Sequence, residues 1–248
     1  MMQTSWHGST GSRLAVAVGA LAALTMVVAL YMMFVYAPPD DLQGDVQRIL
    51  YLHVPLAWVA FLAFFVTFVG GIGYLWRRQR GWDQVARASA EIGLVFTTLV
   101  LLTGSLWGKP IWGTWWTWDA RLTTTLLLWF IYLGYFMLRS YVSDPDRAAR
   151  YAAVLGIFGF VDVPIIYKSV DWWRTLHPGP VVRTDGAAMP GSMLATLLVS
   201  LAAFTLLYAY LLYQKSVIER TRDEIADYQY RLYERQAERE IREGATTR

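Results

Sequence analysis

The chain has 248 residues, of which 56% are hydrophobic and only 17% are charged. A soluble protein of this length does not need so much apolar surface, so the composition indicates an integral membrane protein. The net charge is +3 and there is no cysteine, which excludes disulfides and thiolate metal sites formed by this chain's own side chains.

Six apolar stretches are long enough, or nearly so, to cross a bilayer, which takes about 20 residues. The sequence therefore predicts an all-α integral membrane protein, a six-transmembrane-helix bundle in residues 1–213 with a charged helical tail in residues 214–248. The predicted spans lie at roughly 14–36, 54–76, 88–107, 122–138, 151–167 and 191–213. The first is too long for a signal-peptide core and no small-x-small cleavage site ends it, so we expect a retained helix.

Six spans place both termini on the same side of the membrane. If that side is the cytoplasm, it carries 16 Lys and Arg residues, against 6 on the opposite side. Without the tail after Tyr213 the count is 8 against 6, and the Arg-dense connection 77–87 is the decisive short loop. The positive-inside rule therefore predicts that both termini are cytoplasmic. The segments 37–53, 107–121 and 168–190 then face outward.

Tryptophan gathers in one of these outward segments, where residues 107–123 read WGKPIWGTWWTWDARLT. Because Gly-Lys-Pro and Gly-Thr interrupt the apolar run and two residues are charged, we do not expect an ordinary membrane helix here. Loops at a water interface rarely expose so much aromatic surface. A tryptophan ring is a flat, polarisable platform with one N–H donor. The segment thus predicts a site for a large, flat, apolar ligand such as a porphyrin, on Trp107, Trp112, Trp115, Trp116 and Trp118.

Two of the three histidines fall in outward segments. His53 precedes Pro55, which suits the first turn of the second helix, and His177 lies in the longest outer loop. Neutral imidazole is a nitrogen ligand for haem iron, and two imidazoles supply both axial positions. The alternative for each is an interfacial histidine with a satisfied hydrogen bond. His7 lies in the polar N-terminus and is expected to be inert.

Charged residues near the tryptophans suit the same ligand, because haem propionates need cationic partners. Four cations are available nearby in sequence, and spacing does not choose among them: Lys109, Arg121, Arg174 and Arg183. Asp119 either caps the helix that begins near Arg121 or orients a tryptophan N–H or a ligand imidazole.

Two acidic residues, Glu91 and Asp162, fall within predicted spans. Ionisable groups there are costly, so they are functional hypotheses by default. Glu91 is close enough to the inner edge to reach water, whereas Asp162, beside Pro164, is expected to pair within the bundle.

The segment Trp107–Thr123 closely resembles the WWD signature of membrane proteins that handle haem. The six spans, the HVP at His53–Pro55 and the SVDWWRTLH at Ser169–His177 extend this resemblance. Residues 30–213 thus resemble the haem exporter protein C family of bacterial cytochrome c maturation. The WWD stretch is highly specific, and no motif position departs from the pattern. The resemblance implies a protein of the bacterial inner membrane that is not an enzyme and that holds haem b on its periplasmic face.

The resemblance also implies which residues and partners are involved. The WWD segment maps onto the five tryptophans with Asp119 and Arg121, and His53 and His177 become the axial ligands of the haem iron. Haem would then pass to a periplasmic haem chaperone, whose own histidine becomes covalently joined to a haem vinyl. Further implied partners are the ABC-type ATPase and membrane subunits of the maturation complex and a small single-span subunit. Membrane lipid is expected as a partner, and nucleic acid is not.

The tail after the last span holds eight Lys and Arg and eight Asp and Glu residues in 215–248. An apolar stripe recurs at alternating spacings of three and four: Ile218, Thr221, Ile225, Tyr228 and Leu232. The stripe lasts barely two heptads, so we expect a solvated cytoplasmic helix with i,i+4 ion pairs. Docking to a cytoplasmic or membrane partner is the alternative.

Three rival functions are distinguishable. A membrane haem-b electron carrier usually stacks its ligands within the bundle on opposite helices, whereas both candidate histidines here lie at outer ends. The haem lyase of another cytochrome c assembly route shares the WWD segment but is generally larger, with more histidines. A transporter of a small solute would not need the tryptophan cluster, and no inverted repeat is apparent.

Overall fold

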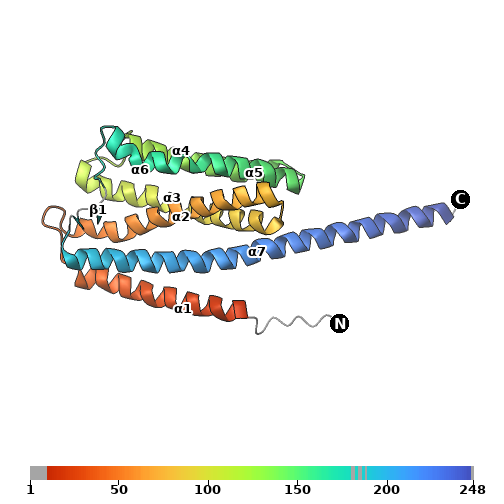
Figure 1. Ribbon diagram of the computed structural model, residues 1–248, viewed down its shortest axis with the longest axis horizontal. Coiled ribbons are helices and arrows are strands. Elements are labelled where there is room, and N and C mark those ends of the chain that lie inside the picture. The colour runs from red at the N-terminus through yellow and green to blue at the C-terminus, as the bar shows by residue number, and fades with distance from the viewer. Residues whose placement is uncertain (1–9, 180–181, 184–185, 188, 247–248) are drawn as a thin grey trace.

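The computed structural model describes residues 10–179, 182–183, 186–187 and 189–246. These residues form an all-helical bundle, with one short antiparallel hairpin of β1 (Val182–Arg183) and β2 (Gly186–Ala187). Six helical segments are long and apolar enough to cross a membrane, which confirms the predicted fold class and number of spans. They lie side by side, and the last helix projects far beyond the bundle (Figure 1).

The helices follow one another in an up-and-down order. Their bounds are α1 Thr10–Tyr31 with a π-helical turn Met32–Tyr36, a 3-10 turn Asp45–Ile49, α2 Leu50–Arg77, α3 Arg80–Trp112, α4 Ala120–Tyr141, α5 Pro145–Phe160, α6 Asp162–Trp172 and α7 Gly191–Thr246. We call the end that carries connections 37–44, 113–119 and α6–α7 the loop end. The opposite end, from which α7 projects, is the tail end, and α1 also begins there (Figure 1).

Helix α3 is longer than predicted at both ends. It continues through Gly108, Lys109 and Pro110 to Trp112, so the expectation that the WWD segment is not helical is wrong for residues 107–112. Pro110 removes one backbone hydrogen bond, which is tolerable two residues before the helix ends. Gly113 then ends α3 in a left-handed conformation, with φ 76°, and its N–H donates to the Lys109 carbonyl at 3.0 Å.

The fifth span is broken into two helices. Helix α5 ends at Phe160, and α6 starts at Asp162 with Pro164 in its first turn, where a missing N–H costs no hydrogen bond. The span Pro145–Trp172 covers 28 residues, more than the 151–167 predicted. Asp162 is buried, and its Oδ2 has no hydrogen-bond partner within the described ranges, so the expected pairing in the bundle is not observed for this oxygen.

Helices α2 and α3 approach closely because each helix has a glycine that packs against an aromatic ring of the other helix. A Cβ on Gly93 of α3 would lie 2.6 Å from the ring of Phe64, and a Cβ on Gly73 of α2 would lie 2.5 Å from Trp82. Small residues at such contacts let helix backbones approach in a bilayer. Phe64 also stacks on Tyr132 of α4, with ring centroids 3.8 Å apart. The core therefore extends from α3 through α2 to α4.

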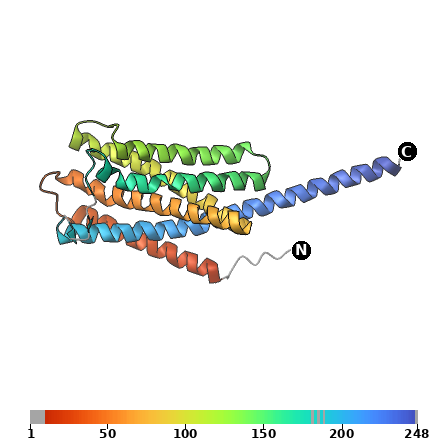
Figure 2. The ribbon, with the colours of Figure 1, turned by 45° about the horizontal axis from the view of Figure 1, so that its top comes forward.

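Helix α7 joins the last span and the tail without a break, over 56 residues. Helix α1 packs on α7 at one edge of the bundle (Figures 1 and 2). At the loop end, Met193 and Leu197 of α7 are buried in a cluster with Leu50 and Tyr51 of α2. The start of α7 thus packs beside the first turn of α2.

Ion pairs fix α7 to α3 at the tail end. Arg87 of α3 pairs with Glu219 at 2.6 Å and with Asp223 at 2.9 Å, and the Glu219 side chain is fully buried. Glu91 pairs with Lys215 at 2.8 Å, and its side chain is 45% exposed; that it reaches water at the inner edge of the membrane stays a prediction. The tail also shows a predicted i,i+4 pair, Arg220–Glu224 at 3.0 Å.

The buried pair at the tail end gives a stability prediction. We expect Arg87→Met to lower the free energy of unfolding by about 3 kcal/mol, because it leaves the buried Glu219 carboxylate without its nearest cation. Arg220→Met is the matched control, since that pair is 72% and 64% exposed and such pairs contribute at most about 1 kcal/mol. Thermal unfolding in detergent, followed by tryptophan fluorescence, measures the stability of both variants. An equal loss of stability in the two would show that the Arg87–Glu219 pair stabilises the fold no more than an exposed pair does.

Candidate functional site

His53 lies in the first turn of α2, at the loop end. The sequence placed Pro55 in the first turn of this helix. Helix α2 begins at Leu50, so Pro55 falls in its second turn instead. The His53 side chain is buried, and its imidazole packs on α3. Nδ1 lies 2.9 Å from Oγ1 of Thr103, and the ring meets Trp107 edge-on, with centroids 5.8 Å apart. The bundle therefore holds this imidazole from one side.

His177 follows α6 on the connection to α7, and it is half-buried. Its Nδ1 lies 2.9 Å from the carbonyl oxygen of Pro178. A carbonyl accepts only, so this hydrogen bond requires the proton on Nδ1 and leaves the lone pair on Nε2. The ring lies 6.3 Å from that of Trp112, centroid to centroid. His177 is thus a neutral ring whose second nitrogen is available to a metal.

The electrostatic setting keeps His177 neutral. Burial, together with the positive charge of Arg121, whose guanidinium nitrogen is 3.4 Å from Nδ1, lowers the pKa of His177 to about 4. His53 lies within electrostatic range of both His177 and Arg121. Three predicted site residues that are far apart in the sequence therefore meet at the loop end.

Asp119 caps α4, which is one of the two roles that the sequence left open, and its other carboxylate oxygen contacts a threonine and not a tryptophan N–H or an imidazole. Oδ1 accepts a hydrogen bond from the Leu122 N–H at 2.9 Å and so caps α4. Oδ2 accepts from the Thr175 hydroxyl at 2.8 Å, and this hydroxyl oxygen accepts from the His177 backbone N–H at 3.0 Å. Asp119 contacts the His177 backbone through Thr175, and thereby fastens the α6–α7 connection to the start of α4.

The five tryptophans of the WWD segment divide into two groups. Trp107 and Trp112 project from the last two turns of α3, and the Trp107 Nε1–H donates to Oε1 of Gln43 at 2.9 Å. The other three lie in the connection 113–119, where Trp115 and Trp118 are 56% and 77% exposed. Trp116 is half-buried and meets Trp118 edge-on at 5.6 Å. Its Nε1–H is buried with no hydrogen-bond partner in the part of the chain that the structure describes.

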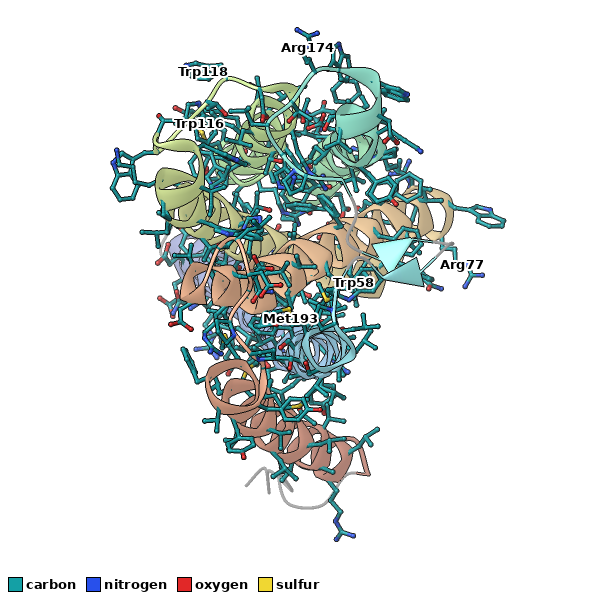
Figure 3. The ribbon with its side chains drawn as sticks, turned by 90° about the vertical axis from the view of Figure 1, so that its left-hand side faces the viewer. Trp58, Arg77, Trp116, Trp118, Arg174 and Met193 are labelled. Carbon is teal, nitrogen blue, oxygen red and sulfur yellow. The ribbon has the colours of Figure 1, made fainter. Side chains whose placement is uncertain are left out.

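The other predicted cations are placed differently. Lys109 lies 5.9 Å from the Trp115 ring centroid, and its Nζ donates to the Gly113 carbonyl at 3.0 Å. Arg174 is exposed on the α6–α7 connection, on the same side of the loop end as Trp116 and Trp118 (Figure 3). The backbone of Arg183 is in β1, but its side chain and the whole of His7 lie outside the described parts of the chain.

Three polar residues contact the predicted site residues and were not foreseen from the sequence: Gln43, Thr103 and Thr175. Thr103 precedes Trp107 by four residues, so the two share one face of a helix. That spacing is a usable signal only if α3 is known to continue past residue 107. Nothing in the local sequence distinguishes Gln43 or Thr175 from ordinary loop residues.

Comparison with known proteins identifies the family of this chain. The family described as Heme exporter protein C matches residues 2–232. The chain is 48% identical to Heme exporter protein C of Bradyrhizobium diazoefficiens over 195 residues, which is 77% of this chain and 74% of the relative. It is also 48% identical to the Escherichia coli K12 protein of that name over 147 residues, 59% of this chain and 60% of the relative.

A mitochondrial relative is more distant. The putative cytochrome c biosynthesis ccmC-like mitochondrial protein of Marchantia polymorpha is 37% identical over 177 residues, 71% of this chain and 75% of the relative. The family match covers the membrane bundle, both histidines and the WWD segment. The chain therefore belongs to the Heme exporter protein C family.

Proposed function

We propose that this protein binds haem b at its loop end and delivers it to a periplasmic haem chaperone during the biogenesis of c-type cytochromes. The observation that carries the proposal is the meeting of His53, His177 and Arg121 at one end of the bundle, next to the WWD tryptophans. His53 and His177 would be the axial ligands of the iron. In this proposal the protein positions a ligand and does not act as an enzyme.

The residues present suit haem in their chemistry. A neutral imidazole with Nε2 free is the form that binds iron. The exposed faces of Trp115 and Trp118 offer apolar contact to a macrocycle. The Arg121 guanidinium lies 3.4 Å from Nδ1 of His177, and the Nε1–H of Trp116 has no acceptor among the residues that the structure describes. Both groups match the carboxylates that haem carries.

Orientation follows from the charges at the two ends. The arginines of connection 77–87 and those near 139–150 belong to the tail end, from which α7 also projects (Figure 1). The positive-inside rule assigns the tail end to the cytoplasm. The loop end with its tryptophans would then face the periplasm, with the bundle in the bacterial inner membrane and both termini cytoplasmic.

Partners follow from the same orientation. The exposed tryptophans of connection 113–119 and the α6–α7 connection would meet the periplasmic chaperone. The ABC-type ATPase and membrane subunits of the maturation complex, together with the small single-span subunit, would associate with the bundle and its cytoplasmic end. The haem-b electron carrier is disfavoured, because His177 lies on a connection and not on a helix opposite His53.

Removing either histidine should remove the iron ligation. In detergent-purified protein we expect about one low-spin haem per chain, and we expect His53→Ala and His177→Ala to lose the haem or convert it to a high-spin form. His7→Ala is the control and should keep the wild-type visible spectrum, with haem quantified as the pyridine haemochrome. If both site variants keep that spectrum, the axial ligands are other residues and the tryptophans serve protein contacts.

The hydrogen bonds of Asp119 make a second prediction possible. Asp144 caps α5 through Arg147 N–H at 2.7 Å as Asp119 caps α4, but Asp144 has no link to a histidine connection in the contacts described. Asp119→Ala and Asp144→Ala should each lose about 1 kcal/mol of stability. Only Asp119→Ala should also lower haem affinity, by about 10-fold, because Thr175 and the His177 backbone lose their anchor. Haem titration of both variants decides whether the anchor matters.

A pH titration tests the state of His177. Its pKa of about 4 lies below the usual value of about 6.5, so protons should not compete with iron at this ring until the pH falls well below 6. ¹³C NMR of the His177 ring, assigned with His177→Gln, should give a midpoint near 4 in wild type. Arg121→Gln should raise the midpoint because a positive neighbour is removed. A wild-type midpoint between 6 and 7 would contradict the buried, Arg121-facing position.

A further inference from the structure

Thr103 of α3 lies outside the WWD segment and contacts His53. Its hydroxyl oxygen lies 2.7 Å from the Leu99 carbonyl oxygen, 3.3 Å from that of Val100, and 2.9 Å from Nδ1 of His53. A hydroxyl has one proton. Two carbonyl oxygens on the preceding turn of α3 accept that proton, the nearer at 2.7 Å. The hydroxyl oxygen must then accept a hydrogen bond from Nδ1–H of His53.

The direction of this hydrogen bond determines the tautomer of His53. With its proton on Nδ1, the neutral ring carries the lone pair on Nε2. We infer that Thr103 is a positioning residue for haem ligation, which holds the His53 imidazole in the tautomer and orientation that present Nε2 to the iron. The inference rests on the proposed function, because only a haem-binding protein would use this lone pair.

Two neighbours of Thr103 on α3 restrict the ring further. A Cβ on Gly104 would lie only 3.1 Å from Cε1 of His53, so the imidazole lies close against the α3 backbone where a larger residue would press on it. Trp107, one turn later, meets the ring edge-on at 5.8 Å. The hydrogen bond with Thr103, the backbone at Gly104 and the ring edge of Trp107 thus all come from one face of α3. They hold the imidazole from the same side.

The chemistry of the partner also matters for the iron. Partners that accept from the second nitrogen of a ligating histidine raise its basicity and fix its orientation. A hydroxyl oxygen is a neutral acceptor and already donates its own proton to α3. It therefore fixes the tautomer without drawing the ring toward an anionic imidazolate, as a carboxylate would. His177 has an equally neutral acceptor, the Pro178 carbonyl, so both imidazoles are held in the same protonation pattern.

The experiment compares Thr103→Val, Thr103→Ser and Thr97→Val. Valine has the shape of threonine but cannot accept a hydrogen bond, whereas serine keeps the hydroxyl. Thr97 is the matched control: it is buried on the same helix, and its hydroxyl donates to the Gly93 carbonyl at 2.8 Å, as Thr103 does to that of Leu99. The readouts are haem affinity by titration, the low-spin fraction, and the haem reduction potential.

We expect Thr103→Val to weaken haem binding by about 10- to 100-fold, reduce the low-spin fraction and shift the potential of the remaining haem to more positive values, because a less basic ligand stabilises the ferric iron less. Thr103→Ser and Thr97→Val should resemble wild type. A Thr103→Val protein with wild-type affinity, spectrum and potential overturns the inference. So does a Thr103→Ser protein as impaired as Thr103→Val, since packing of the methyl group and not the hydroxyl would then be responsible.

A measurement without haem separates this inference from the proposed function. Long-range ¹H–¹⁵N NMR of the haem-free protein shows which nitrogen of His53 carries the proton, assigned by comparison with His53→Gln. We expect Nδ1–H in wild type and a mixture of tautomers in Thr103→Val. A proton on Nε2 in wild type would overturn the role of Thr103 and leave the proposed function open. A haem spectrum insensitive to His53→Ala would instead overturn the role of His53 as an axial ligand in the proposed function, and this inference with it.

Discussion

Helices α2 and α3 approach closely where Gly73 faces Trp82 and Gly93 faces Phe64, and both ends of the protein depend on this contact. At the loop end the approach brings Thr103 within hydrogen-bond distance of His53. At the tail end it leaves Arg87 of α3 in position to meet the buried Glu219 of α7. A bilayer provides little hydrophobic driving force between helices, so tight packing of small residues against rings is the main source of specificity there.

The number of spans could be read from the sequence because a bilayer demands a long apolar run, and such runs are a one-dimensional signal. The ends of α3 could not be read in this way. Residues 80–87 and 108–112 are helical but polar or glycine- and proline-containing, so hydropathy stops before the helix does. Pro164 indicated a break in the fifth span. The position of the break, at Val161, depends on how α5 and α6 pack.

The site could be recognised from the sequence because it contains tryptophan and histidine, two residue types that stand out in a chain. The chain has only three histidines, and five of its twelve tryptophans lie within residues 107–118, so their gathering on one side was visible once the spans were counted. Thr103, Gln43 and Thr175 are common polar residues, and their contacts with His53, Trp107 and Asp119 cross between segments 50 or more residues apart. Such contacts depend on interhelical distance and rotation, which no local pattern encodes. The cap that Asp119 forms on α4 was predicted, because an aspartate just before a helix is a local signal, whereas its contact with Thr175 was not.

The two candidate ligands are held with different rigidity, and this suits a protein that must release what it binds. His53 is buried on a helix and is contacted by α3 along one side. His177 is half-buried on a connection, fastened through Thr175 and Asp119. In the proposed handover, the ligand on the connection is the easier one to exchange for a chaperone's histidine, because moving it disturbs hydrogen bonds and no packing between helices.

The unbroken course of α7 makes it a rigid rod that reaches from the buried cluster beside His53 to the far side of the membrane. At 1.5 Å per residue its 56 residues span about 84 Å, against about 30 Å for the hydrocarbon core of a bilayer. The last ion pair with α3, Arg80–Asp227, acts as a fulcrum, and the helix extends about 28 Å beyond it. A tilt of about 10° at the fulcrum would move the tip by about 5 Å. Met193 lies about 51 Å from that ion pair on the other side, so any repacking around Met193 and Leu197 that tilts the rod would move the distant end in the opposite direction, by about half as much.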